Sequence, residues 1–121
     1  MTSKEEKLME PLEDLGDVKG IKGAAVVRRD GLLIASNLKG DIDDDQVGAM
    51  TASTVGSGET ASEALNMGDV NQVTIESEEG KLISTGAGSE GILTILTEED
   101  VNMGLIKVEM TDAVNKVKQV L

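Results

Sequence analysis

Three observations predict that this sequence folds as one α/β domain with a largely antiparallel sheet and layers of helices. Segments that alternate apolar and polar residues occur in neighbouring pairs joined by short turn sequences, which is typical of β-hairpins. Longer segments carry apolar residues at helical spacing. The 121 residues contain no internal repeat and no low-complexity linker, so the whole chain, 1–121, is interpreted as a single domain. The predicted order is helix, two strands, helix, three strands, helix.

The first predicted helix lies near the start of the sequence. Ser3 and Glu6 have the spacing of a capping box, and Gly16 ends the apolar pattern. Pro11 lies inside that pattern, and a proline removes a hydrogen-bond donor and crowds the preceding turn. We therefore expect this helix to be kinked or to begin late. Its apolar residues at helical spacing are Leu8, Leu12 and Leu15.

The first hairpin is predicted from a strong turn sequence. Two apolar segments, 24–29 and 32–36, flank the dipeptide Asp30-Gly31. This dipeptide favours a two-residue type I′ turn, in which glycine supplies a positive φ. The sequence therefore predicts two antiparallel strands joined at Asp30-Gly31.

Three further strands and a helix are predicted in the second half of the chain. Strand alternation over 71–77 is followed by Glu79-Gly80, which we interpret as the turn into a strand at 81–84. Residues 92–96 are continuously apolar, as in a buried strand. The last segment is a helix, with an apolar face formed by Met103, Ile106, Met110, Ala113, Val117 and Val120.

The middle helix is predicted from near Asp43 to Met67, with Gly68 as its stop. It contains several glycines, each of which costs about 1 kcal/mol relative to alanine inside a helix. We expect its apolar face to cover the sheet. The residues of that face, spaced by threes and fours, are Val47, Met50, Thr54, Gly58, Ala61 and Leu65.

A second face of the middle helix is made of small residues. Ala49, Ala52 and Gly56 are three and four residues apart and share this face, with Gly48 beside them. Small side chains allow another backbone to approach closely, so we interpret this face as the contact with the same helix of a second copy about a two-fold axis. The alternative is that these residues fit closely against the chain's own sheet.

Composition and charge restrict the possible partners. The net charge is −12, and aromatic residues are absent, so binding to nucleic acid is not expected. The same sign disfavours anionic membrane surfaces, and no apolar segment approaches the ~18 residues of a membrane span. There is no Cys and no apolar signal-type stretch behind the polar start, so a cytoplasmic protein is expected.

Motifs with possible chemical roles are weak. Residues 86–91 match G-x-G-x-x-G, but an apolar strand follows the match where a dinucleotide fold needs a helix. A flexible connection between strands is the favoured interpretation, and phosphate binding is the alternative. Asp41, Asp43 and Asp45 resemble the start of a calcium loop, but the required glycine and glutamate are missing, which favours helix capping.

The remaining residues do not form a recognisable catalytic group. Without His or Cys, the usual general base, thiol nucleophile and zinc ligands are missing. Arg28 and Arg29 are the only arginines, and either could act in trans on a bound nucleotidase. The simpler interpretation is a strand-end charge beside Asp30. We therefore expect a protein that is not an enzyme and has no cofactor and no metal.

Several segments of the sequence resemble the roadblock/dynein light chain family. The most specific are residues 20–36, GIKGAAVVRRDGLLIAS, and the segment NMGLIK at 102–107. The resemblance continues through 73–76, 80–82 and 92–96, and so covers nearly the whole chain. It implies a profilin-like sandwich, in which a five-stranded antiparallel sheet has the middle helix on one face and the terminal helices on the other.

The resemblance also implies a function. Family members pair through the middle helix and the following strand, which here points to Gly48, Ala49, Ala52, Gly56, Val73 and Ile75 as a homodimer interface. Members act as adaptors in dynein and endosomal signalling complexes and as regulators of Ras-like GTPases in prokaryotes. We therefore expect a homodimeric, non-catalytic platform that binds a small Ras-like GTPase and modulates its nucleotide cycle. The alternatives are a passive scaffold subunit and a small-ligand sensor at the glycine loop 86–91.

Overall fold

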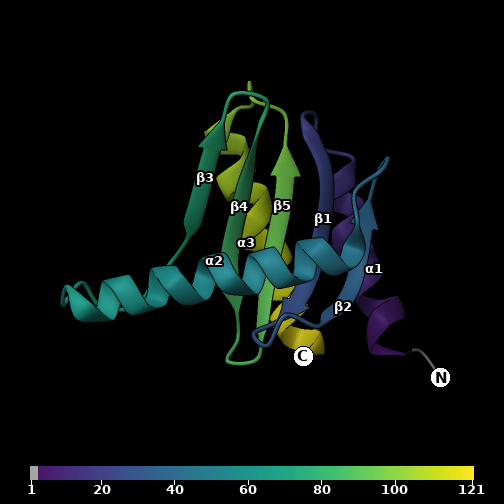
Figure 1. Cartoon of the computed structure of the whole chain (residues 1–121). Coiled ribbons are helices and arrows are strands. Elements are labelled where there is room, and N and C mark those ends of the chain that lie inside the picture. Colours follow the sequence, from purple (N-terminus) through teal and green to yellow (C-terminus); the bar gives the residue numbers. More distant parts are fainter. Residues whose placement is uncertain (1–2) are drawn as a thin grey trace.

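The structure is a computed structural model that describes residues 3–121. Three helices and five strands follow one another in the predicted order (Figure 1). The elements are α1 (Lys4–Gly16), β1 (Ile21–Arg28), β2 (Leu33–Leu38), α2 (Asp44–Ala64), β3 (Val73–Ser77), β4 (Gly80–Ala87), β5 (Gly91–Thr97) and α3 (Met103–Val120).

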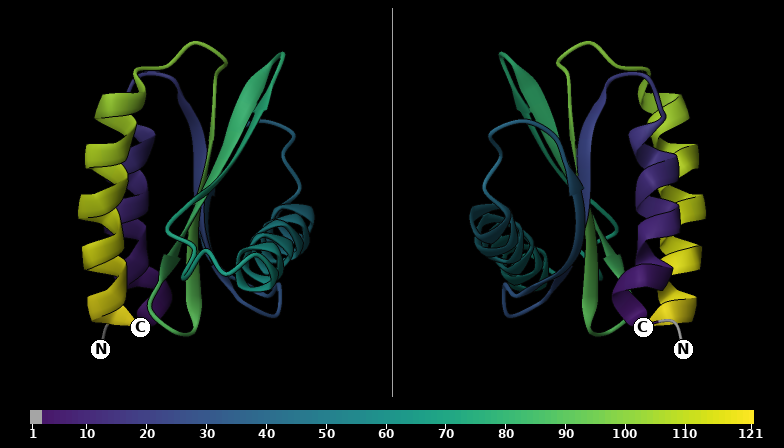
Figure 2. Two further views of the ribbon diagram at one scale, coloured as in Figure 1. Left: turned by 90° about the vertical axis from the view of Figure 1, so that its left-hand side faces the viewer. Right: turned by 90° about the vertical axis from the view of Figure 1, so that its right-hand side faces the viewer.

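The five strands form one antiparallel sheet in the order β2-β1-β5-β4-β3. Two views from the sides show α1 and α3 side by side on one face of the sheet and α2 alone on the other (Figure 2). This arrangement confirms the predicted fold class, with the terminal helices on one face and the middle helix opposite. β2 and β3 are the two edges of the sheet.

Helix α1 contains Pro11 and does not begin late. Ser3 caps it by accepting a hydrogen bond from the Glu6 backbone N–H (3.2 Å), as the capping-box spacing predicts. The helix then continues through Pro11 to Gly16. The expectation of a late start was wrong because Pro11 is itself buried in the core with the leucines, and this burial offsets the lost hydrogen bond. The three leucines buried with it are Leu8, Leu12 and Leu15.

The first hairpin is confirmed, but its turn is not type I′. Gly31 has φ +95°, whereas Asp30 does not have the positive φ that type I′ requires. The Arg28 carbonyl accepts from the Gly31 N–H (2.9 Å), and the Arg28 N–H donates to the Leu32 carbonyl (2.8 Å). These bonds enclose a three-residue loop, 29–31, with the left-handed residue at its end. The sequence locates the glycine correctly but does not set the loop length.

The second hairpin is confirmed with its turn shifted by one residue. Ser77 pairs with Gly80, so Glu78 and Glu79 form the turn and Gly80 is the first residue of β4. Glycine is needed there for another reason, because a Cβ atom at Gly80 would lie 2.6 Å from the Thr97 carbonyl oxygen of β5.

The main core lies between the sheet and the pair α1–α3. It includes apolar side chains of α1, of α3 and of the three central strands, among them Val26, Ile83, Leu93 and Ile95. The apolar face predicted for α3 is confirmed, since Ile106, Met110, Ala113 and Val117 are buried and Met103 and Val120 pack against the core. No helix within residues 3–121 is sufficiently long and apolar to cross a membrane.

The layer between α2 and the sheet is more polar than the main core. Ser84 and Thr94 share a buried hydroxyl–hydroxyl hydrogen bond of 2.8 Å on this side of the sheet. Thr51 of α2 is fully buried, and its hydroxyl has no hydrogen-bond partner among the described residues. An unpartnered buried hydroxyl is unfavourable because it loses its bond to water.

We expect Thr51→Val to stabilise the protein by about 1 kcal/mol, because valine has the same shape and removes the unpaired hydroxyl. This corresponds to an increase of roughly 4 °C in Tm for a domain of this size. Thermal unfolding measures it, with Thr54→Val as the control on the same helix, where the half-buried hydroxyl can reach water. A Thr51→Val protein no more stable than the parent would mean that the hydroxyl is satisfied, for instance by a buried water.

Candidate self-association surface

The face of α2 that covers the sheet matches the predicted one only in part, since Val47, Thr54 and Gly58 are half-buried but the largest apolar residues are not. Of the predicted apolar face, Met50 is 53% exposed and Leu65 is 68% exposed. The prediction was wrong because it placed the largest apolar side chains inward, whereas the close approach of α2 to β1 and β2 requires small ones. The buried residues of α2 are Gly48, Thr51, Val55 and Ser62.

Three of the predicted interface residues lie near the chain's own first hairpin. Gly48 is buried, and a Cβ atom there would lie 2.5 Å from the Gly31 carbonyl oxygen. A Cβ atom at Gly31 would lie 3.6 Å from Ala49 Cα and 3.7 Å from Ala52 Cβ. For Gly48, the alternative of a close fit within the chain therefore holds. Ala49 is exposed and Ala52 half-buried, so both still present surface beside the hairpin.

Gly56 lies on the outer side of α2, and a Cβ atom there would meet nothing within 4 Å. It belongs to a shallow groove of about 610 Å³ in which no side chain is larger than threonine. The groove is lined by Ala52, Ser53, Gly56, Ser57, Thr60, Ala61 and Ala64. The predicted small-residue face thus exists as an accessible surface on α2, displaced from the hairpin.

The strand β3 presents Val73 and Ile75 on the same side of the sheet as α2. A Cβ atom at Gly58 of α2 would lie 3.0 Å from Val73 Cγ2. Ile75 shares this side because alternate residues of a strand point the same way. It pairs with Leu82, and Leu82 pairs with Leu96, so three apolar side chains form a row across β3, β4 and β5. Ile75 is 42% exposed, and the two leucines are half-buried.

The C-terminal turns of α2 project beyond the edge of the sheet. In Figure 1, α2 crosses the strands and continues past β3, leaving part of the strands on that face uncovered. Leu65 and Met67, at the projecting end, are 68% and 70% exposed. The end is held in shape by Ser62, whose hydroxyl donates to the Gly68 carbonyl (2.6 Å) and whose carbonyl accepts from the Met67 N–H (2.9 Å). An exposed apolar helix end beside an open strand edge is a surface typical of protein association.

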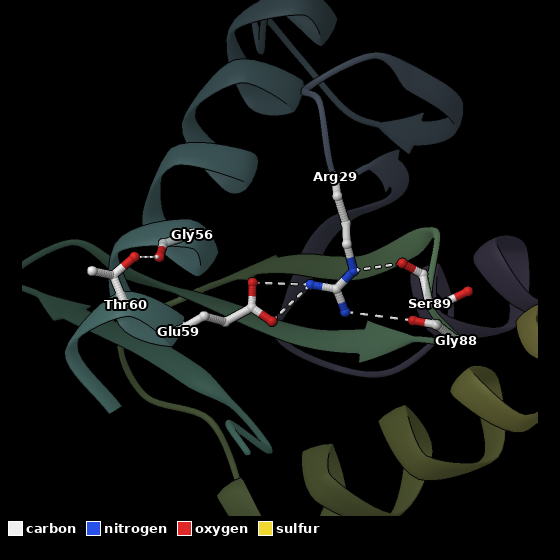
Figure 3. A network of polar contacts seen from close by, with 6 residues as sticks. All are labelled: Arg29, Gly56, Glu59, Thr60, Gly88 and Ser89. Atoms are coloured by element: carbon white, nitrogen blue, oxygen red, sulfur yellow. Dashed lines mark hydrogen bonds and ion pairs between the residues drawn. The ribbon is translucent and has the colours of Figure 1, made fainter. Parts of the chain in front are cut away.

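Arg29 connects α2 to two hairpins, a role that the sequence does not reveal (Figure 3). Its Nη1 donates to both carboxylate oxygens of Glu59 (2.8 and 3.0 Å), and its Nε donates to the Ser89 carbonyl (3.0 Å). Arg28 instead pairs with Asp30 at 2.7 Å, as the simpler interpretation predicted. Arg29 and Glu59 lie 30 residues apart, so no local spacing could have indicated their contact.

We expect Arg29→Gln to destabilise the protein by about 1 kcal/mol through loss of these bonds. A double-mutant cycle with Glu59→Gln should give a coupling energy below about 1 kcal/mol, because both side chains are partly exposed and the pair is screened by solvent. Urea unfolding of the four proteins measures both quantities. A coupling energy of zero would show that Arg29 stabilises the fold only through the carbonyls of the β4–β5 loop.

The other predicted motifs have structural roles. The glycine loop is the hairpin connection between β4 and β5, with Gly88 at φ +80°, so the strand-to-strand interpretation is confirmed. Asp43 caps α2 by accepting from the N–H groups of Asp45 (2.9 Å) and Gln46 (3.2 Å). Among residues 3–121, no group of three or more carboxylate, imidazole or thiol side chains is arranged to hold a metal ion.

The fold, with its open β3 edge, is that of a small α/β sandwich domain. A comparison with known families identifies the family. Residues 7–97 match the model of the Roadblock/LC7 domain, and the chain belongs to this family. An uncharacterized protein of Methanocaldococcus jannaschii is 45% identical over 107 residues, covering 88% of this chain and 93% of the relative.

Solved structures agree with this assignment. The Roadblock/LC7 domain from Streptomyces avermitilis has a TM-score of 0.85 at 22% identity, covering 91% of this chain and 93% of that one. MglB of Myxococcus xanthus has a TM-score of 0.89 at 18% identity, covering 99% and 91%, and MglB is also known in a tetrameric arrangement. At these identities, the likeness concerns the fold.

Proposed function

We propose that this protein is a homodimeric, non-catalytic platform that binds a small Ras-like GTPase and modulates its nucleotide cycle. The observation that carries the proposal is the open edge of β3 beside the projecting, apolar end of α2, in a chain of the Roadblock/LC7 family. The resemblance to prokaryotic family members that regulate such GTPases supplies the partner class.

The geometry of this surface supports self-association. A second copy joined to β3 edge to edge and related by a two-fold axis continues the sheet. The projecting turns of each α2 then lie over the β3 and β4 strands of the other copy, where Val73, Ile75 and Leu82 offer apolar contacts. The tetrameric arrangement known for MglB supports association in this fold. The interface so defined contains Val73 and Ile75, whereas Ala49, Ala52 and Gly56 lie on the hairpin side and outer side of α2, and Gly48 is buried.

The proposed effect on the GTPase requires no catalytic side chain from this chain. A rigid dimer that binds one conformation of the GTPase switch segments shifts their equilibrium toward it. Arg29 is held by Glu59 and by two backbone carbonyls, so donation of this arginine in trans would first have to break those bonds. We therefore propose ordering of the switch segments as the mechanism.

The test is capture of partners from the native cell extract with the tagged protein, in the presence of GTP or GDP. A Ras-like GTPase recovered more strongly with one nucleotide is the expected result. The purified pair is then assayed for hydrolysis and for nucleotide exchange. If both rates are unchanged, the regulatory proposal fails, and a partner recovered equally with either nucleotide indicates a passive scaffold instead.

A further inference from the structure

A groove on the opposite face of the sheet is separate from the proposed association surface. It has a volume of about 600 Å³ and runs between α3 and segment 70–72, which leads into β3. Thr85 and Gly86 of β4 line its inner side. The apolar residues that α3 contributes are Met103, Ile106, Met110 and Val114. Met103 is half-buried and can adapt to different apolar side chains, whereas Met110 is 3% exposed and forms the floor of the groove.

The groove follows a strand edge that has no partner. The pairing of β3 with β4 begins at Val73 and Ser84 and ends at Ser77 and Gly80. β4 continues to Ala87 and pairs with β5 from Lys81 to Ala87. Residues 85–87 therefore lack a strand on their outer side within the described part of the chain. Segment 70–72 runs past them without strand pairing. Such an edge offers backbone N–H and C=O groups to an added strand.

The groove is positively charged on a protein that is otherwise strongly acidic. Lys107 and Lys118 are its only ionisable side chains, although the net charge of the chain is −12. Both are exposed, and neither has an ion-pair partner among residues 3–121. They are 11 residues apart on one helix, which is about 16 Å along its axis. An extended chain covers that distance in about five residues.

We propose that this groove binds an extended, acidic segment of a partner protein. The segment adds to the outer edge of β4 beside Thr85, inserts apolar side chains toward Met103 and Met110, and places carboxylates near Lys107 and Lys118. Repulsion by distant acidic groups is screened beyond about 8 Å at physiological ionic strength. Glu59, Glu63 and Asp69 line a neighbouring hollow that shares Lys118, so the segment is placed on the α3 side of the groove. The proposal concerns a different face from the dimer and does not depend on it.

Methionine-methyl NMR tests this directly, because the chain has six methionines and no aromatic residues to complicate the spectrum. The probe is a nine-residue synthetic peptide of alternating valine and glutamate, and its counterpart has lysine in place of glutamate. We expect saturable shifts of the Met103 and Met110 signals when the acidic peptide is added, and no shifts when the lysine peptide is added. The signals of Met50 and Met67, on the α2 side, should stay in place.

The double variant Lys107→Glu, Lys118→Glu should bind the acidic peptide at least tenfold more weakly. A matched control, Lys4→Glu with Lys19→Glu, makes the same change in net charge at exposed lysines outside the groove and should bind normally. The proposal is overturned if Met103 and Met110 do not shift at millimolar peptide, if both peptides bind equally, or if the control variant loses as much affinity. The oligomeric state measured on the same samples tests the dimer separately.

Discussion

Replacing Gly48 with alanine should destabilise the protein by about 2 kcal/mol, although the same change usually stabilises a helix by about 1 kcal/mol. The reason is that the new methyl group would lie 2.5 Å from the backbone carbonyl oxygen of Gly31. A backbone atom of a hairpin cannot move aside as the end of a flexible side chain can. The helix and the hairpin must therefore separate, and the buried layer under α2 loosens.

Gly56→Ala is the matched control on the same helix. A methyl group there meets nothing within 4 Å in the single chain, so only the gain in helix propensity remains, about 1 kcal/mol. Urea unfolding at equal protein concentrations should give shifts of opposite sign for the two variants. Two stabilising shifts would mean that α2 does not pack against Gly31 as closely as the structure indicates.

Ile75→Asp should convert the dimer into a folded monomer, with the dissociation constant raised by about 100-fold or more. The substitution places a charge on the exposed side of β3, where the second sheet and the end of the partner's α2 meet in the proposed dimer. Leu105→Asp is the control, since Leu105 is 43% exposed and Ile75 is 42% exposed, but Leu105 lies on α3. Light scattering after gel filtration measures the mass. A dimer that persists in Ile75→Asp would exclude the β3 edge as the interface.

A second pair of variants separates the two flanks of α2. Ala52 lies toward the first hairpin, whereas Ala61 lies on the flank of Gly58, which contacts Val73. The proposed edge-to-edge dimer places the partner helix on the Gly58 flank, so Ala61→Glu should weaken the dimer more than Ala52→Glu. The reverse order would favour association on the flank of α2 that faces the first hairpin.

The sequence by itself determined the order of elements, the antiparallel sheet and the N-terminal caps of α1 and α2, whereas α2 ends at Ala64, before the predicted Met67. These features depend on contacts between residues close in sequence: the Ser3 and Asp43 caps, the glycine at the end of the first turn and the leucine spacing of α1. Strand alternation also located β3 and its exposed Ile75. Local patterns were sufficient here because each signal and its partner lie within a few residues.

The tertiary structure decided which side of α2 faces the sheet, the role of Arg29 and the length of the free β4 edge. The helix has two faces of similar polarity, so its periodicity could not show that Gly48 and Thr51 are buried while Met50 and Leu65 are exposed. That choice depends on how closely the hairpin at Gly31 approaches the helix. The contact of Arg29 with Glu59 and the register that leaves residues 85–87 unpaired likewise join segments far apart in sequence. Such contacts arise only when the sheet is assembled, because they are set by packing distance and strand register.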